Sequence, residues 1–173
     1  VSGRTNTKGV TQKFMDMTQK NYFIGHESGQ QLTSGLYNST IGYQSGLSIT
    51  DGNSNSFIGY QSGYNNNTGS NNSFFGSNSG FSNLNGNYYV FAGDSSGFSN
   101  TSGSYNVFVG FNSGKNQTSG DGNIFVGNMS GEDNSSGDAN IFLGNQAGQH
   151  NTSGWGNTFL GYFSGWQNGG GCY

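Results

Sequence analysis

The sequence contains no proline, a single cysteine and few charged residues. One cysteine excludes a disulfide framework and a structural zinc site within one chain. Five lysine and arginine residues cannot form the basic patch that binds nucleic acid, so we expect no nucleic-acid partner. No apolar run approaches the length of a transmembrane helix, so we expect no membrane insertion.

Aliphatic residues are also scarce. Leu, Ile, Val and Phe together number 32 of 173 residues, which excludes an ordinary two-layer core with amphipathic helices. Such scarcity is typical of disordered chains when the net charge is high, but the net charge here is only −3. The chain instead has 33 Gly, 14 Phe and 10 Tyr, so it can bury aromatic side chains. Its length is that of one domain.

A repeat of 17 residues fills positions 21–173 with nine units and no remainder. The unit reads N-x-F-[IVL]-G-x-x-S-G-x-x-N-T-S-G-x-x, and we number its positions from the opening Asn. Glycine occupies unit positions 5, 9 and 15 in every unit. Unit position 3 is Phe in every unit except the second, where Thr40 stands. This column is the predicted structural core: Phe23, Phe57, Phe74, Phe91, Phe108, Phe125, Phe142 and Phe159.

A 17-residue unit is too short to bury a face alone, so neighbouring units must cover it. Three fixed glycines and no helical period exclude a helix pair and predict one coil of a β-solenoid. We therefore predict an all-β fold, a parallel β-solenoid (β-roll) of nine 17-residue coils, roughly 40 Å long at the usual strand spacing. The Asn columns of the unit are expected to form amide ladders between coils.

Unit position 4 forms a second apolar column directly after the Phe column. Adjacent residues of a strand point to opposite faces, so both faces of this strand are apolar. We expect another copy of the chain to cover the second column, which makes the protein an oligomer. The alternative is a β-bulge or glycine kink that turns both columns inward. The possible interface comprises Ile24, Ile41, Ile58, Val109, Val126, Leu143 and Leu160.

Residues 1–20 lie outside the repeat and are predicted to be an N-terminal capping segment or an arm that contacts a neighbouring subunit. The spacing of Val10, Phe14 and Met17 allows a short helix. The last unit has no cap, which indicates a chain that continues, a fragment, or subunits that stack end to end into a filament. Cys172 near this end is either a crosslink between chains or a free thiol.

Segments such as NSFIGYQSG at 55–63 and NIFLGNQAG at 140–148 resemble the N-T-F-I-G-Y-Q-A-G repeats of bacterial and phage tail-fibre-domain proteins. More distantly they are similar to the coils in the heads of trimeric autotransporter adhesins. The resemblance covers 21–173. It implies a left-handed parallel β-roll packed as a homotrimer, and an extracellular shaft or adhesive fibre.

Few residues could carry chemistry. His26 and His150 occupy different unit positions, and the adjacent Glu132 and Asp133 are expected to face apart. The aspartates are expected to be scattered over different columns, so we predict no metal site and no cofactor. With no catalytic constellation in view, we expect a protein that is not an enzyme. The aspartates concerned are Asp51, Asp94, Asp121, Asp133 and Asp138.

Three binding features are visible in the repeat. Aromatic residues after the first two glycine columns could stack on surface glycans, although packing between turns or chains is the favoured interpretation. A partial Thr column resembles the array of an ice-binding solenoid, and Asn-x-Ser/Thr sequons suggest glycan attachment. The aromatics are Tyr43, Tyr60, Phe111, Tyr162, Tyr64, Phe81, Phe98 and Trp166. The threonines are Thr33, Thr50, Thr101, Thr118 and Thr152. The sequons begin at Asn38, Asn66, Asn71, Asn100, Asn116, Asn128, Asn134 and Asn151.

The predicted function is that of an extracellular structural repeat protein, at a cell or virion surface, which forms a rigid fibre or a self-assembling filament. Its partners are copies of itself, through a lateral trimer or end-to-end stacking. The alternatives are a trimeric adhesin or phage tail-fibre segment that binds surface glycans, and an ice-binding solenoid.

Overall fold

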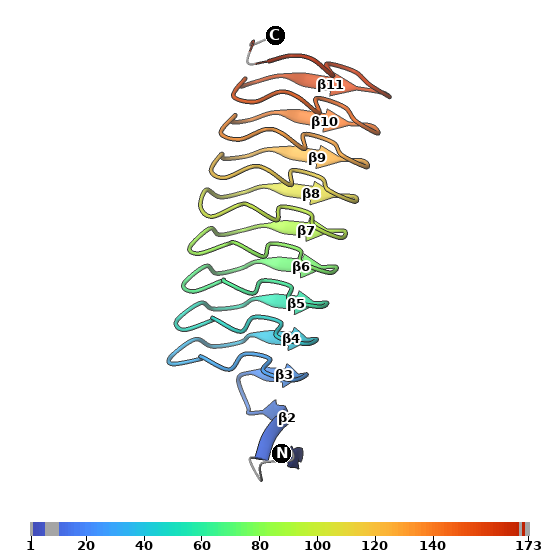
Figure 1. Cartoon of the computed structure of the whole chain (residues 1–173). Helices are drawn as coiled ribbons and strands as arrows, with labels where there is room; N and C mark the ends of the chain where they lie inside the picture. Colours follow the sequence, from blue (N-terminus) through green and yellow to red (C-terminus); the bar gives the residue numbers. More distant parts are fainter. Residues whose placement is uncertain (1, 6–10, 170, 172–173) are drawn as a thin grey trace.

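The computed structural model describes residues 2–5, 11–169 and 171, and it has the form of a coiled ladder (Figure 1). All eleven described strands belong to one sheet, in chain order. Nine of them are parallel and recur every 17 residues, so eight full turns separate β3 from β11 and the predicted parallel β-solenoid is confirmed. The strands are β1 (Ser2–Thr5), β2 (Thr11–Met17), β3 (Tyr22–Ile24), β4 (Ser39–Ile41), β5 (Ser56–Ile58), β6 (Ser73–Phe75), β7 (Val90–Ala92), β8 (Val107–Val109), β9 (Ile124–Val126), β10 (Ile141–Leu143) and β11 (Thr158–Leu160).

Each parallel strand pairs with the next at an offset of one unit. Phe74 lies opposite Phe91, and Phe125 opposite Phe142, and every parallel pair keeps this register. Equivalent side chains are therefore stacked one above another along the rod. Because side chains alternate with period two, a single inserted residue would exchange the inner and outer faces of the following strand segment.

Unit position 5 requires glycine for two reasons, its backbone conformation and its close contact with the next coil. Gly127 has a φ of +140°, and a Cβ built on it would lie 2.3 Å from the carbonyl oxygen of Gly144 in the next coil. Gly137, at unit position 15, is required by close approach, since its Cβ would lie 2.2 Å from the oxygen of Gly154. These contacts explain why the glycine columns have no exceptions: coils at the strand spacing leave no room for a side chain there.

The interior is a stack of phenylalanine rings. From Phe57 to Phe142 each ring of the column is fully buried, and successive centroids are 4.7–5.0 Å apart with nearly parallel planes. Phe23 is buried at one end, and Phe159 is half-buried at the other. This is offset-stacked packing of the kind that aromatic pairs prefer.

The second unit fills its interior differently. Thr40 replaces Phe there, is fully buried and hydrogen-bonds to the Ser28 hydroxyl. The same unit has Ile49 where later units have an amide residue, and Ile49 is fully buried in the hydrophobic core. A larger apolar side chain at one position thus compensates for a smaller one at another, as core packing at constant volume requires.

Amide ladders join the coils, as the Asn column predicted. Asn55 Nδ2 donates to Asn38 Oδ1 (3.0 Å) and to the carbonyl of Gly69 (2.8 Å). Asn157 repeats the ladder contact with Asn140 at 3.0 Å. These residues are buried, so each amide satisfies backbone groups that would otherwise be costly to desolvate.

A second ladder runs along unit position 12, the other Asn column of the repeat, where amide residues recur at 17-residue spacing. Asn83 donates to Asn66 (2.6 Å) and Asn151 to Asn134 (3.1 Å). Gln117 takes part in this ladder as acceptor from Asn134 (3.0 Å). The polar interior of the rod therefore has two parallel rows of amides beside the aromatic stack.

The fifth unit breaks the first ladder. Tyr89 stands in the Asn column, stacks on Phe91 with centroids 4.8 Å apart and donates its hydroxyl to the carbonyl of Ser102 (2.8 Å). Its burial raises the pKa of Tyr89 well above the usual range. The ring extends the aromatic core sideways at this level, and the hydroxyl still finds the backbone partner that a buried phenol needs.

The N-terminal segment is a β-hairpin. The predicted short helix was wrong: Phe14 and Met17 lie in strand β2, and Val10 is outside the described residues. β1 pairs antiparallel with β2, and β2 pairs antiparallel with β3 through Met15 opposite Ile24. The free edge of the first coil's strand is thus occupied by β2, which leaves no room there for another strand.

Candidate functional site

The strand of each coil separates an inner from an outer apolar column. In β9, Phe125 is fully buried, whereas Val126 beside it is 37% exposed. Ile41 is 44% and Leu160 75% exposed, and both belong to the same outer column. The alternative of a kink that turns both columns inward is therefore wrong. Along this column Ile58 and Val109 are likewise exposed, while Ile24 and Leu143 are half-buried.

A further outward-facing column lies at unit position 2 of the same strands. It begins with Tyr22 and three serines, is aliphatic from β7 to β10, and ends with Thr158 in β11. Val90, Ile124 and Ile141 in this column are exposed. Neither outward column contains a charged residue in any of the nine parallel strands. The outer face of the sheet is thus an uncharged stripe that runs the length of the rod, and it becomes wholly aliphatic in β7–β10.

Many aromatic side chains on the turns stack on one another, while Phe111 is exposed without a ring neighbour among the described residues. His26, Tyr43 and Tyr60 form one row, with centroids 5.4 and 5.6 Å apart. A second row joins Tyr64 to Phe81 and Phe98 at 5.0 Å per step, and a third pairs Tyr88 with Tyr105. Tyr43 and Phe81, in the middle of their rows, have a ring neighbour on both sides, whereas rings at the row ends such as Tyr60 and Tyr105 have a neighbour on one side only and are exposed.

The threonine column also makes contacts along the rod. Thr101 Oγ1 donates to the carbonyl of Thr118 (2.9 Å), and Thr118 Oγ1 donates to that of Ser135 (3.0 Å). Thr152 does the same toward Gly169 (3.1 Å). In the fourth unit the column is interrupted by the exposed Leu84. These hydroxyl hydrogens are committed to the backbone of the next coil and hold neighbouring turns together.

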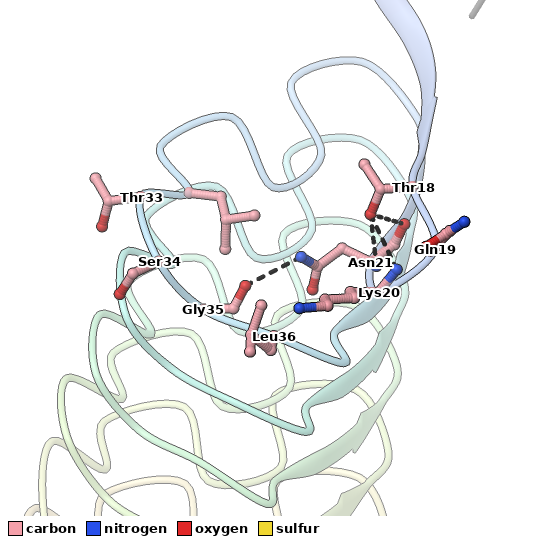
Figure 2. Close-up of a pocket in the computed structure, with 9 residues that line it drawn as sticks. Thr18, Gln19, Lys20, Asn21, Thr33, Ser34, Gly35 and Leu36 are labelled. Atoms are coloured by element: carbon pink, nitrogen blue, oxygen red, sulfur yellow. Dashed lines mark hydrogen bonds between the residues drawn. The ribbon is translucent and has the colours of Figure 1, made fainter.

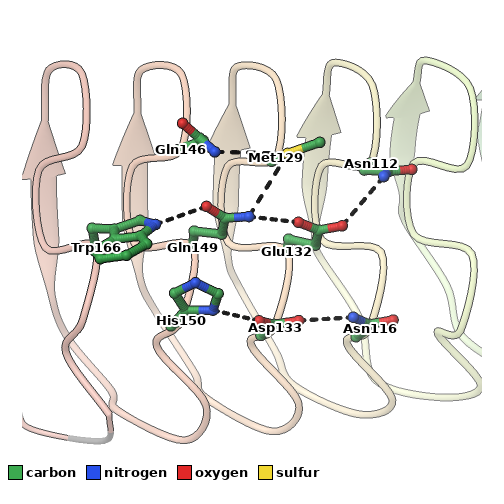
Figure 3. Close-up of polar contacts among 9 residues, drawn as sticks. All are labelled: Asn112, Asn116, Met129, Glu132, Asp133, Gln146, Gln149, His150 and Trp166. Carbon is green, nitrogen blue, oxygen red and sulfur yellow. Dashed lines mark hydrogen bonds and ion pairs between the residues drawn. The ribbon is translucent and has the colours of Figure 1, made fainter.

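Two polar chains cross the later coils (Figure 3). Trp166 Nε1 donates to Gln149, and Gln149 Nε2 donates to Glu132 Oε2 (2.8 Å). His150 Nδ1 lies 2.6 Å from Asp133 Oδ2 in a separate contact. As expected, Glu132 and Asp133 have different partners. Each of these contacts joins one coil to the next, so the polar side chains hold neighbouring turns together.

One expectation about the aspartates was wrong. Asp121 and Asp138 are not in different columns but share unit position 16. Asp138 Oδ1 accepts from the backbone N–H of Asp121 (2.8 Å), and Asp121 Oδ1 accepts from that of Ser104 (2.6 Å). Their carboxylates therefore bind backbone amides of the preceding coil. Within the described residues, no group of three or more His, Cys, Asp or Glu side chains is placed to share a metal ion.

The fold sorts the eight sequons by accessibility. The asparagines of five sequons are fully buried, and most of these amides are bound in the ladders; they are Asn38, Asn66, Asn100, Asn134 and Asn151. A glycan cannot be joined to such an amide in the folded chain. The remaining sequons, at Asn71, Asn116 and Asn128, have exposed side chains.

A hollow lies at the N-terminal end of the rod, where β2 covers only the strand side of the first coil (Figure 2). Thr18 to Asn21 form one wall, and Leu32 to Leu36 the other. Asn21 Nδ2 crosses between them to the carbonyl of Gly35 (3.0 Å). The hollow is open to solvent and corresponds to the space that a preceding coil would fill.

No helix in the described part of the chain is long and apolar enough to cross a membrane. Cys172 lies outside the described residues, and so does its predicted crosslink. No family model, curated protein or solved structure matches the chain. What the molecule itself provides is a β-solenoid with 17-residue turns, and its most distinctive surface is the uncharged outer face of the sheet.

Proposed function

We propose that the protein is a rigid structural rod of an extracellular fibre, at a cell or virion surface, with no catalytic role. The observation that carries this proposal is the unbroken, in-register pairing of nine parallel strands. An aromatic stack, two amide ladders and backbone hydrogen bonds all run along the same axis. Bending the rod would strain all of them at once, so the repeat itself supplies stiffness.

The resemblance of the repeat to tail-fibre-domain proteins and adhesin heads supports the extracellular placement. Glycan binding, the function of the alternative adhesin, is less well supported by the aromatic rows. Tyr43 has ring neighbours on both sides, and sugars bind to free ring faces. Ice binding is less well supported because Leu84 interrupts the threonine array and the hydroxyls of Thr101 and Thr118 donate to backbone carbonyls.

Stiffness can be tested by the distance between two spin labels on the rod. Labels at Ser39→Cys in β4 and Thr158→Cys in β11, in a Cys172→Ser background, are seven coils apart, which corresponds to about 34 Å between backbones. Double electron–electron resonance on labelled chains diluted with unlabelled protein should give one narrow distribution near this value. A broad distribution would show that the coils move relative to one another, and the rod proposal would then be wrong.

A further inference from the structure

Strands β7–β10 display only aliphatic side chains outward, and we call their eight outward residues the aliphatic face. No other described strand from β3 to β11 has aliphatic residues at both outward positions. Most of these side chains are exposed and the rest are half-buried. Contiguous exposed apolar surface of this kind marks interaction sites in soluble proteins. The residues are Val90, Ala92, Val107, Val109, Ile124, Val126, Ile141 and Leu143.

The fold does not require an aliphatic residue at unit position 2, which supplies four of these eight side chains. β4, β5 and β6 have Ser39, Ser56 and Ser73 at unit position 2, in the same backbone register and with the same inner column. A serine side chain is therefore compatible with this site in the solenoid. The change from serine to valine and isoleucine alters the surface, while the inner residue of each strand stays buried and the parallel register is kept.

We propose that a second copy of this chain binds the aliphatic face side by side, in register and pointing in the same direction. This inference deepens the proposed function, because it states how the rods of a fibre are joined. The face suits an identical partner, since neither outward column contains a charge that would repel its own copy. A second solenoid also presents its side chains at the same axial spacing of about 4.8 Å, so equivalent rows can interdigitate.

The available area agrees with a stable contact. Nine parallel strands give a face about 38 Å long, and the strand with two residues on either side spans about 20 Å. The product for the whole outer face is close to the roughly 800 Å² per partner of a typical specific interface, and the four strands of the aliphatic face supply about half of it. The flanking residues include the exposed Tyr88, Tyr105 and Phe111. Aromatic residues beside an aliphatic centre are typical of protein–protein interfaces.

The direction follows from the distribution of the serines. A full-length partner pointing the opposite way would place β4 against β10, β5 against β9 and β6 against β8. Serines would then lie opposite the aliphatic strands at most levels. A partner pointing the same way places β7–β10 against β7–β10, so the aliphatic side chains of both copies gather in one contact.

Sedimentation equilibrium tests the contact. The wild-type protein should show a mass of at least twice 18.2 kDa at high micromolar concentration. The double variant Ile124→Thr, Val126→Thr keeps β-branched side chains in the strand but removes apolar contact, and its association should be at least about tenfold weaker. The control Leu84→Thr removes an exposed aliphatic from another face and should leave association unchanged. A monomeric wild type, or a double variant that associates like wild type, would overturn the proposal.

Crosslinking tests the direction. In a Cys172→Ser background, Ser39→Cys and Thr158→Cys lie near opposite ends of the outer face. With a short bis-maleimide, each variant should crosslink to itself, and a mixture should give no product between the two. Crosslinks formed only in the mixture would show the opposite direction. The spin-label distance measured on the monomeric Ile124→Thr, Val126→Thr background reports rod stiffness separately, so failure of the contact and failure of the rod remain distinguishable.

Discussion

The coils of β4–β6 and those of β7–β10 share one backbone and differ in their outer surface. In both groups the strands pair at an offset of 17 residues, and the inner position is fully buried. Outward, the first group combines Ser39, Ser56 and Ser73 with apolar neighbours, while the second is aliphatic throughout. The repeat therefore fixes what faces inward, and it leaves the outward positions free to serve something other than the fold.

This comparison separates two reasons for an apolar residue in a strand. Phe74 is apolar because its ring is stacked between rings of the coils before and after it. Ile124 and Val126 have no such interior partner and are exposed. At the position of Ile124, the serines of β4–β6 show that a polar side chain is tolerated. The predictions below change inner and outer positions in each group of coils, and begin with the largest effect.

Glycine at unit position 5 should be equally essential in both groups. In Gly59→Val and Gly127→Val the new Cβ would lie 2.3 Å from a carbonyl oxygen of the next coil, at a φ near +140°. Each variant should lose more than about 4 kcal/mol of unfolding free energy, measured by chemical denaturation. Gly122→Asn is the control, since no atom lies within 4 Å of its Cβ and Asn71 adopts a similar φ at the equivalent position. Wild-type stability of Gly127→Val would contradict the stacking.

Replacing phenylalanine should destabilise the fold at the buried inner position of a strand and have little effect at the exposed outer position. Phe74→Ala and Phe108→Ala each leave a void in the ring stack and should cost about 3–5 kcal/mol. Phe75→Ala makes the same chemical change one residue along, where the side chain is 42% exposed, and should cost less than about 1 kcal/mol. Thermal and denaturant unfolding of the three variants would settle this. Similar losses at positions 74 and 75 would show that the strand does not have one inner and one outer face.

The outer surface of β4–β6 should be convertible into that of β7–β10. The triple variant Ser39→Val, Ser56→Val, Ser73→Val extends the aliphatic face along the rod, with no change in its interior. Its self-association should become at least about tenfold tighter, since burial of each added side chain is worth of order 1 kcal/mol. The same substitution at Ser102, Ser119 and Ser136, on another side of the coil, is the matched control. Equal effects from the two triple variants would mean that apolarity alone, and not this face, drives association.

The smallest effect concerns Asp51, which stands where β7–β10 coils have serine. Hydrogen bonds from Ser34 and Thr33 lower the pKa of Asp51 below its usual value. A lowered folded-state pKa stabilises the fold above the unfolded-state pKa, and this contribution is lost as the pH falls toward the folded value. Ser34→Ala should move the pKa of Asp51 upward in a carboxyl NMR titration. An unchanged titration would show that the two hydroxyls do not bind the carboxylate in solution.

Much of the fold could be predicted because the repeat is strict. Gly127 and its equivalents at constant spacing required coils of fixed length, and the position of Phe125 beside Val126 predicted two opposed apolar columns. Other features depend on tertiary contacts that spacing does not reveal. Tyr88 and Ser54, both at unit position 17, adopt positive φ values without being glycine, which the spacing of the glycine columns does not reveal. The apolar spacing around Met15 was compatible with a helix, but the segment forms strand β2 because it pairs with β3.

The candidate surface was only half visible in the sequence. The outer column of Ile41 and Val126 was recognised, but the column of Val90 and Ile124 beside it was not. Its signal was present in the change from serine to β-branched residues at unit position 2. The structure was needed to determine whether a column faces inward or outward, because β-branched residues are favoured in strands on either face.

Small-angle X-ray scattering over a concentration series tests the central claim most directly, since it measures the length and the cross-section of the rod together. The account predicts that, as concentration rises, the mass per unit length at least doubles while the length of the solenoid stays near 40 Å. Growth in length at constant cross-section would contradict it, because the coils would then be joining through their ends and not through the aliphatic face.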